Sequence, residues 1–183
     1  MKSSFVVLII VGLIILLLVV SIISMINSIR RASIKIEEAA SDIDVSLTKR
    51  YDVLTKMIEV VKGYAKHEKE VMFTTVELRK NMTLDEMTKA NLQMDDNYNK
   101  VIAVAEAYPD LKASENFMVL QKAIVDVEEH LQAARRFYNS NVTHYNELIE
   151  IFPTNIIAKR YGYNRKDYFK ADEEATTYFK IES

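Results

Sequence analysis

The chain has 183 residues, of which 49% are hydrophobic and 27% charged, with 24 Lys and Arg against 26 Asp and Glu. That length suits one modest domain with a short appendage. The net charge of -2 argues against a general electrostatic grip on nucleic acid. With no cysteine, the chain has no disulfide, thiolate nucleophile or thiolate zinc site, and 3 Gly and 2 Pro disfavour phosphate-cradling loops and turn-rich β folds.

An uncharged apolar run extends from Phe5 to Ile26. Roughly 22 helical residues span about 33 Å, enough to cross the hydrocarbon core of a bilayer. A cleaved signal peptide has a shorter apolar region followed by small residues at a cleavage site, whereas this run continues into Asn27 and Ser28. We therefore predict an uncleaved transmembrane helix over residues 5–26, preceded by a short extracytoplasmic N-terminus over residues 1–4.

Basic residues are more frequent after the apolar run than before it. Lys2 precedes the run, and Arg30, Arg31 and Lys35 follow it. Because cationic side chains resist translocation, these flanks predict a single-pass membrane protein with its C-terminal domain in the cytoplasm. The three juxtamembrane cations can also touch anionic headgroups, although three charges are few for recognition of one particular lipid.

The residues after the span repeat apolar positions every three or four residues, which is typical of helices. Nothing in the chain chemistry breaks a helix before Lys62, so the transmembrane helix is expected to continue into the domain. The apolar stripe of this first helix is Ile36, Ala40, Ile43, Leu47, Tyr51, Leu54, Ile58, Val61 and Ala65. A second helix is predicted over residues 67–80, with Val71, Met72, Thr75 and Leu78 on one side.

The next helix has a clear start and a clear end. Thr83 followed three residues later by Glu86 forms a capping box, and Pro109 disfavours helical geometry at Tyr108. These signals predict a helix over residues 84–107. Its stripe is Leu84, Met87, Asn91, Met94, Tyr98, Ile102 and Ala105.

The longest stripe has coiled-coil-like spacing and covers residues 117–152. Its members are Phe117, Leu120, Ile124, Val127, Leu131, Ala134, Tyr138, Val142, Tyr145, Ile149 and Phe152. Pro153 is expected to end this helix, residues 156–158 to add one turn, and Gly162 to cap it.

These patterns predict an all-α protein in which the transmembrane helix continues into an elongated antiparallel bundle of three to four long helices plus short C-terminal elements. The bundle is assigned to residues 27–162. Residues 163–183 form a C-terminal tail, expected to dock in part through the aromatic pairs Tyr168–Phe169 and Tyr178–Phe179.

Motifs for catalysis and metal binding do not assemble in this sequence. A di-iron bundle needs Glu-x-x-His, but no histidine has Glu three residues before it, and His67-Glu68 lacks the second histidine of a zinc protease. No Gly-x-Ser-x-Gly elbow occurs. We therefore predict no enzymatic activity, metal, cofactor or small-molecule substrate. A Ser-His-Asp site assembled from distant residues stays open as an alternative.

Seven polar residues in the middle of the long helices are candidate contacts between helices or with a partner. They are Asp42, Asp44, Arg50, Asp52, Arg135, Arg136 and Asn139. Acidic and basic groups that meet across an antiparallel bundle would specify its register more than its stability. For each residue alone, the competing interpretation is a solvated face with charge pairs four residues apart.

Several segments resemble the LemA family: SDIDVSLTKRYD at residues 41–52, VKGYAKHE at 61–68, AEAYPDLKA at 105–113 and AARRFYN at 133–139. The resemblance implies a single N-terminal transmembrane helix and a mostly helical cytoplasmic domain, but no established reaction, cofactor or catalytic residue. Family members often have Ala-Trp where this chain has Ala39-Ala40, and Pro-Asn where it has Thr55-Lys56. They are often encoded near a membrane zinc protease, which suggests a role in envelope quality control.

The anchor, the bundle, the missing catalytic motifs and the resemblance together predict a single-pass protein of the bacterial inner membrane whose cytoplasmic bundle binds other proteins as a scaffold or adaptor. The expected partners are the lipid bilayer and a protein, either a membrane protease or a second copy of the chain. Two alternatives stay open: a hydrolase or protease-associated cofactor with a noncontiguous site, and a lipid-binding or membrane-shaping protein.

Overall fold

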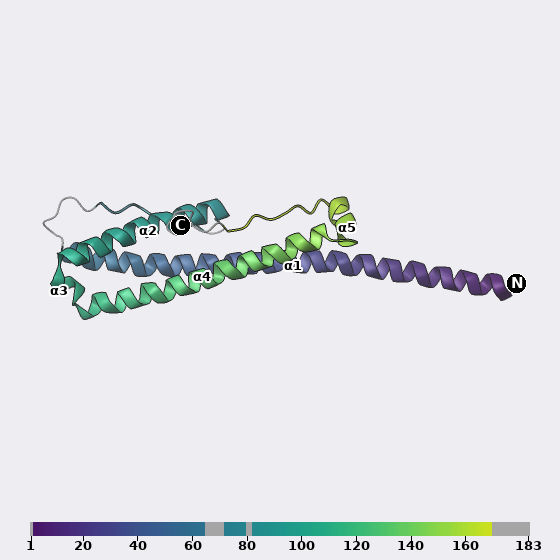
Figure 1. Cartoon of the computed structure of the whole chain (residues 1–183), viewed down its shortest axis with the longest axis horizontal. Helices are drawn as coiled ribbons and strands as arrows, with labels where there is room; N and C mark the ends of the chain where they lie inside the picture. The colour runs from purple at the N-terminus through teal and green to yellow at the C-terminus, as the bar shows by residue number, and fades with distance from the viewer. Residues whose placement is uncertain (1, 65–71, 80–81, 170–183) are drawn as a thin grey trace, which may run out of the picture. The chain divides into compact units, whose positions relative to one another are not determined.

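The computed structural model describes residues 2–64, 72–79 and 82–169 (Figure 1). Within these residues the helices are α1 (Lys2–Tyr64), α2 (Leu84–Ala107), α3 (Pro109–Lys112), α4 (Glu115–Glu150) and α5 (Thr154–Tyr161). This described part of the chain contains no strand, and its helices pack together as a bundle. The predicted all-α class is confirmed.

The chain divides into two compact units. Unit 1 comprises Met1–Glu38 and Asn139–Tyr168, and unit 2 comprises Ala39–Tyr138 and Phe169–Ser183. Helices α1 and α4 are each divided between the two units, with one segment in unit 1 and one in unit 2.

The apolar run and the stripe that follows it form one helix, α1. Residues 5–24 are exposed on all sides, and α1 is long and apolar enough to cross a membrane. Burial begins with Met25 and Ile26, which are half-buried, and is complete at Ile29. The apolar end of α1 is therefore a candidate membrane anchor.

The buried seam of α1 differs from the predicted stripe by one residue at three places. Ala39, Arg50 and Met57 are buried, whereas the predicted Ala40, Tyr51 and Ile58 are only half-buried. The seam follows a strict seven-residue spacing through Ile29, Ile36, Ile43, Arg50 and Met57. This spacing keeps one face of a helix turned toward its neighbours.

The predicted helix over residues 67–80 is wrong where the structure describes it. Residues 72–79 are extended, and residues 65–71 and 80–81 lie outside the described part of the chain. The stretch Phe73-Thr-Thr-Val76 is aromatic and β-branched, which favours extended backbone. The side-chain amide of Asn97 holds this backbone by bonding to both the N–H and the carbonyl of Thr74.

Helix α2 has the predicted bounds, Leu84–Ala107, because its capping box forms as expected. The Thr83 hydroxyl accepts the Glu86 N–H, and the Glu86 carboxylate accepts the Thr83 N–H at 2.9 Å. After Met94, however, the buried side chains are Asn97, Val101, Val104 and the predicted Ala105, whereas the predicted Tyr98 and Ile102 are half-buried. The buried positions shift by one residue at Asn97 because its side chain faces inward to bind the main chain of Thr74.

Helix α4 ends at Glu150, so the prediction that Phe152 belongs to its buried stripe is wrong. Phe152 lies beyond the helix and is 79% exposed. The short helix α5 ends as predicted at Gly162, whose φ of 73° is a left-handed conformation that glycine adopts without strain.

Of the C-terminal tail, the structure describes residues up to Phe169, whose side chain is buried at 4% exposure. Tyr168, the other member of the first aromatic pair, is 43% exposed. The second pair, Tyr178–Phe179, lies outside the described residues.

Candidate functional site

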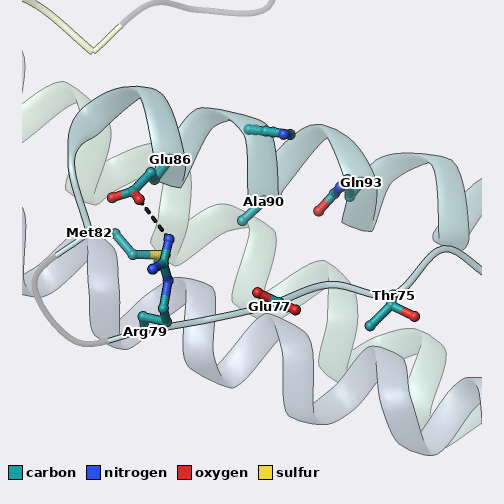
Figure 2. Close-up of a pocket in the computed structure, with 8 residues that line it drawn as sticks. Thr75, Glu77, Arg79, Met82, Glu86, Ala90 and Gln93 are labelled. Carbon is teal, nitrogen blue, oxygen red and sulfur yellow. Dashed lines mark hydrogen bonds and ion pairs between the residues drawn. The ribbon is translucent and has the colours of Figure 1, made fainter.

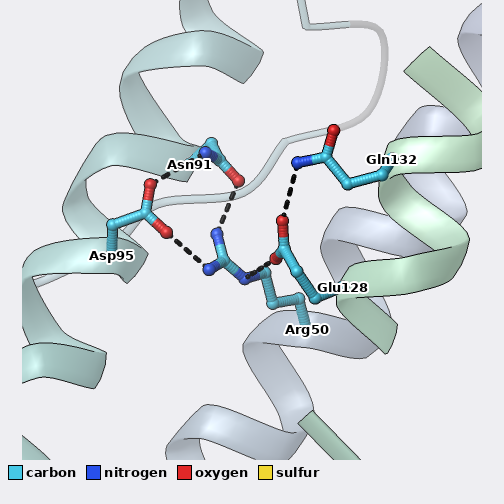
Figure 3. Close-up of polar contacts among 5 residues, drawn as sticks. All are labelled: Arg50, Asn91, Asp95, Glu128 and Gln132. Atoms are coloured by element: carbon cyan, nitrogen blue, oxygen red, sulfur yellow. Dashed lines mark hydrogen bonds and ion pairs between the residues drawn. The ribbon is translucent and has the colours of Figure 1, made fainter. Parts of the chain in front are cut away.

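A buried arginine joins three helices of unit 2 (Figure 3). Arg50 occupies a seam position of α1, and its side chain is 6% exposed. An uncompensated cation in such a place would carry a large desolvation cost, so its partners decide whether the site is stable.

Helix α2 supplies two of the partners of Arg50. One terminal nitrogen donates to Asn91 Oδ1 at 2.6 Å, and the other donates to Asp95 Oδ1 at 2.5 Å. Asn91 Nδ2 in turn donates to Asp95 Oδ2 at 3.0 Å. Since Asn91 and Asp95 are four residues apart, they project from one face of α2 and receive the two ends of one guanidinium.

Helix α4 supplies the third partner. Glu128 Oε2 lies 3.1 Å from Arg50 Nε, at an angle that makes an ion pair without hydrogen-bond geometry. Gln132, one turn later on α4, donates to Glu128 Oε1 at 3.0 Å and orients the carboxylate. Arg50 therefore connects α1 with both α2 and α4 in unit 2.

The chemistry of this cluster suits a contact that favours one alignment of neighbouring helices. It places one cation between two carboxylates whose side chains are each 36% exposed, so the excess negative charge remains solvated. The fork of Arg50 fits these acceptors only at one relative position of the helices. Arg50, Asp95 and Glu128 thus link the three helices in unit 2.

The acidic residues predicted near Arg50 do not join this cluster. Asp42 and Asp52 are exposed and Asp44 is half-buried. The main-chain carbonyls of Asp42 and Asp44 accept the hydroxyls of Ser46 and Thr48, each at 2.9 Å. The acidic partners of Arg50 come instead from α2 and α4.

The other predicted polar residues occupy different environments. Arg135 is buried at 8% exposure, with its guanidinium 4.9 Å from the centre of the Phe169 ring, a cation–π contact within unit 2. Arg136 is exposed, and Asn139 is half-buried in unit 1. The juxtamembrane cations Arg30, Arg31 and Lys35 are all exposed.

A groove of about 380 Å³ lies between the extended segment and α2 (Figure 2). Thr75, Glu77 and Arg79 line it from the extended segment, where alternate side chains share one side. Helix α2 contributes Glu86, Lys89, Ala90 and Gln93, and Met82 lies near the end of the groove. The groove is therefore bounded by extended backbone on one side and by a helix on the other.

An ion pair in this groove is accessible to solvent. Arg79 donates to Glu86 at 2.8 Å, with side chains 70% and 42% exposed. The Thr83 N–H, then the Thr83 hydroxyl, lower the pKa of Glu86 below its ordinary value of 4.5, and Arg79 adds to this effect. Glu86 is consequently a fixed negative charge at neutral pH rather than a proton donor.

Two buried asparagines hold extended segments against helices in the same way. Asn97 bonds to the N–H and carbonyl of Thr74 at 2.8 and 2.7 Å in unit 2, and Asn146 bonds to those of Lys166 at 2.9 and 3.0 Å in unit 1. We refer to these as the Asn97 clamp and the Asn146 clamp. Sequence reasoning missed both, because a single amide on a helix gives no signal of a distant backbone partner.

No group of three or more His, Asp or Glu side chains within residues 2–64, 72–79 and 82–169 is arranged to hold a metal ion.

Comparison with known proteins gives one extensive match and several short ones. A sequence model of the LemA family matches residues 39–182. Protein LemA of Metamycoplasma hominis is 30% identical over 152 residues, which are 80% of this chain and 69% of that protein. Magnetosome protein MamQ of Magnetospirillum gryphiswaldense is 26% identical over 70 residues, and magnetosome protein MamQ 2 of Paramagnetospirillum magneticum is 28% identical over 71 residues. These short matches cover 26% of each MamQ protein and 38% and 39% of this chain.

Proposed function

We propose that this chain, which belongs to the LemA family, is a membrane-anchored scaffold or adaptor that binds other proteins. Resemblance to that family implies no established reaction, so the proposal is argued from the structure. Helix α1 provides the anchor and unit 2 provides the binding surface. The observation that carries this proposal is the groove between residues 75–79 and α2.

The groove suits an extended peptide segment of a partner. One wall is extended backbone, and extended segments recognise peptides by pairing along their length while alternate side chains provide specificity. Thr75, Glu77 and Arg79 are all exposed along that wall. The Asn97 clamp fixes the wall at Thr74, so the backbone is held in position before a partner binds.

Charge supports the same role. The groove presents Glu77 and Glu86 together with Arg79 and Lys89, two charges of each sign. Such a surface selects a partner that carries complementary charges in a matching order and repels one with the opposite order. The ionised Glu86 argues against acid–base catalysis in this groove, so we place protein binding before a hydrolase function.

The proposal also assigns a location and a kind of partner. Arg30, Arg31 and Lys35 follow the apolar run, which favours the inner membrane with the bundle on the cytoplasmic side. The partner is then a protein that reaches this side of the membrane. A membrane protease of envelope quality control fits that description, and so does a second copy of the chain.

Charge reversal in the groove tests the proposal in the full-length chain. Glu77→Arg combined with Lys89→Glu keeps the net charge but reverses the sign of the charge at two of the four charged positions of the groove. We expect the amount of protein crosslinked to the tagged chain in intact cells to fall about tenfold, as expected for about 1.4 kcal/mol of lost binding energy. The matched control is Lys122→Glu with Glu129→Arg, which inverts two exposed charges on α4. Equal crosslinking by both double variants would refute binding through the groove.

A further inference from the structure

We propose that the corner between α4 and α5 inserts into the surface of the bilayer that α1 crosses. The corner consists of Ile151, Phe152 and Ile156, all of which belong to unit 1. This inference rests on the proposed membrane anchoring of α1 and adds a second, peripheral contact of the folded domain with the lipid.

The corner exposes an unusual amount of apolar side chain. Phe152 is 79% exposed, Ile156 is 60% exposed and Ile151 is 53% exposed. Isolated apolar residues on a surface need no explanation, but these three lie within six consecutive positions around one turn. Ile157 and Ala158 on the other side of α5 are buried at 9% and 1% exposure. Helix α5 therefore packs on the unit through one face and presents Ile156 outward together with Lys159 and Arg160.

The corner lies at the end of the apolar run. In unit 1, the end of α4 and helix α5 lie beside the part of α1 that follows this run (Figure 1). Protein covers α1 from Met25, which is half-buried, to Ile29, which is fully buried. With a rise of 1.5 Å per residue, these residues occupy about 6 Å along α1, similar to the thickness of one headgroup layer. This part of α1 consequently lies at headgroup depth.

The surface of α1 changes character at the same level. A hollow of about 380 Å³ on this helix is lined by Val20, Ile23 and Ser24 within the apolar run, and by Asn27, Ser28 and Arg31 beyond it. An apolar wall that becomes polar and cationic within two to three turns matches the boundary between acyl chains and phosphate headgroups. The hollow thus marks the level on α1 at which the apolar run ends.

Charge favours an anionic lipid surface over a protein partner at this place. Residues 25–35 and 151–161 together contain five basic residues and no acidic one: Arg30, Arg31, Lys35, Lys159 and Arg160. All five are exposed. Glu150, directly before the corner, is paired with Arg165 at 2.8 Å. Apolar side chains beside an excess of cations are typical of segments that lie in the interface of anionic bilayers.

The chain contains no tryptophan, so a single introduced tryptophan is a unique fluorescent reporter of depth. We would place the full-length chain in vesicles whose lipids are brominated near the headgroup end of the acyl chains, and measure quenching of Phe152→Trp. The control is Ile34→Trp, an exposed site about 12 Å beyond Ile26 along α1. The reference for anchoring is Ile23→Trp, inside the apolar run.

We expect about threefold stronger quenching of Phe152→Trp than of Ile34→Trp, with blue-shifted emission, as for aromatic side chains in the interface. Ile156→Trp reports the same corner from α5 and replaces Phe152→Trp if that variant does not fold. Equal, weak quenching at positions 152 and 34, with strong quenching at position 23, overturns the inference alone. Weak quenching at position 23 as well overturns the anchoring on which both proposals rest. A blue shift at position 152 without quenching means that a protein covers the corner, and it also overturns the inference.

Discussion

The two units fasten an extended segment with the same device but build their helix seams from different residues. In each unit a buried asparagine bonds to both main-chain groups of one residue, Thr74 in unit 2 and Lys166 in unit 1. The seam of α1 is apolar in unit 1, with Ile29 and Ile36, but includes the charged Arg50 in unit 2.

This difference separates stability from specificity. An apolar seam packs well in more than one register, whereas a buried guanidinium with fixed acceptors does not. Unit 2 bears the proposed binding groove, so a defined alignment of α1 and α2 serves recognition there. Unit 1 needs only to hold its extended segment against α4, for which the Asn146 clamp and apolar packing are sufficient.

Among the substitutions that distinguish the two units, replacement of Arg50 should have the largest effect on stability. Arg50→Met removes the cation and leaves the Asp95 and Glu128 carboxylates without their shared partner. Because both carboxylates are partly solvated, we expect a loss of about 3 kcal/mol in the free energy of unfolding of unit 2. Hydrogen exchange of the chain in detergent micelles would measure this at the amides of α2. The control Lys49→Met, at an exposed neighbouring position, should change exchange little.

Removal of each clamp should have a smaller and local effect. Asn97→Ala leaves the main-chain groups of Thr74 without their amide partner, and Asn146→Ala does the same to Lys166. We expect each substitution to lower the free energy of local opening of its segment by about 2 kcal/mol, which would be measured as faster hydrogen exchange at the Thr74 and Lys166 amides. Asn99→Ala, an exposed neighbour on α2, is the control. If Asn97→Ala loosened the segment around Lys166 as strongly as its own, the two clamps would not be independent devices.

Loss of the helix caps at Thr83 and Gly162 should lower the free energy of unfolding by a smaller amount than loss of a clamp. Thr83→Ala removes the hydroxyl of the capping box at the start of α2, which should cost about 1 kcal/mol. Gly162→Ala places a side chain at a φ of 73° after α5, with about 1 kcal/mol of strain. The melting temperature of each variant measures these effects. No change for Gly162→Ala would contradict the left-handed conformation.

The smallest expected effect is opposite pH dependence in the two units. In unit 2, the Thr83 N–H is the main reason that the pKa of Glu86 lies below 4.5, and the hydrogen bond from Lys100 is the main reason that the pKa of Asp96 lies below 3.8. The two ionised carboxylates therefore stabilise unit 2 above these ordinary values, and this stabilisation should be lost as pH falls through the lowered pKa values. Burial, then Tyr163, raises the pKa of Tyr145 above 10.0 in unit 1. That stabilisation is present below pH 10.0 and is lost as pH rises through the raised value. Hydrogen exchange at both extremes would show whether each unit responds at its own end.

Local signals predicted much of the fold. The capping box set the start of α2, Pro109 its end, and Gly162 the end of α5, because each acts within a few residues of itself. The second helix was wrongly predicted because residues 72–79 are held extended by Asn97, about 23 positions away, and local spacing cannot reveal such a partner.

The central polar cluster was predicted only in part. Arg50 was a candidate, but Asp95 and Glu128 were not, since acidic residues on helices are usually solvated. A stripe built from apolar residues alone preferred Tyr51 and so placed Arg50 beside the seam. The signal was available: Arg50 lies seven residues after Ile43 and seven before Met57, on the heptad spacing.

Photo-crosslinking along the groove would test the central claim most directly. A photoreactive residue would be placed singly at Thr75 and at Gln93 in the groove, and at Lys122 on α4, in the full-length chain in native membranes. Protein binding in the groove predicts the same crosslinked partner at Thr75 and Gln93 and none of it at Lys122. The claim would be contradicted by a partner captured equally at all three sites, or by no protein captured at the groove positions.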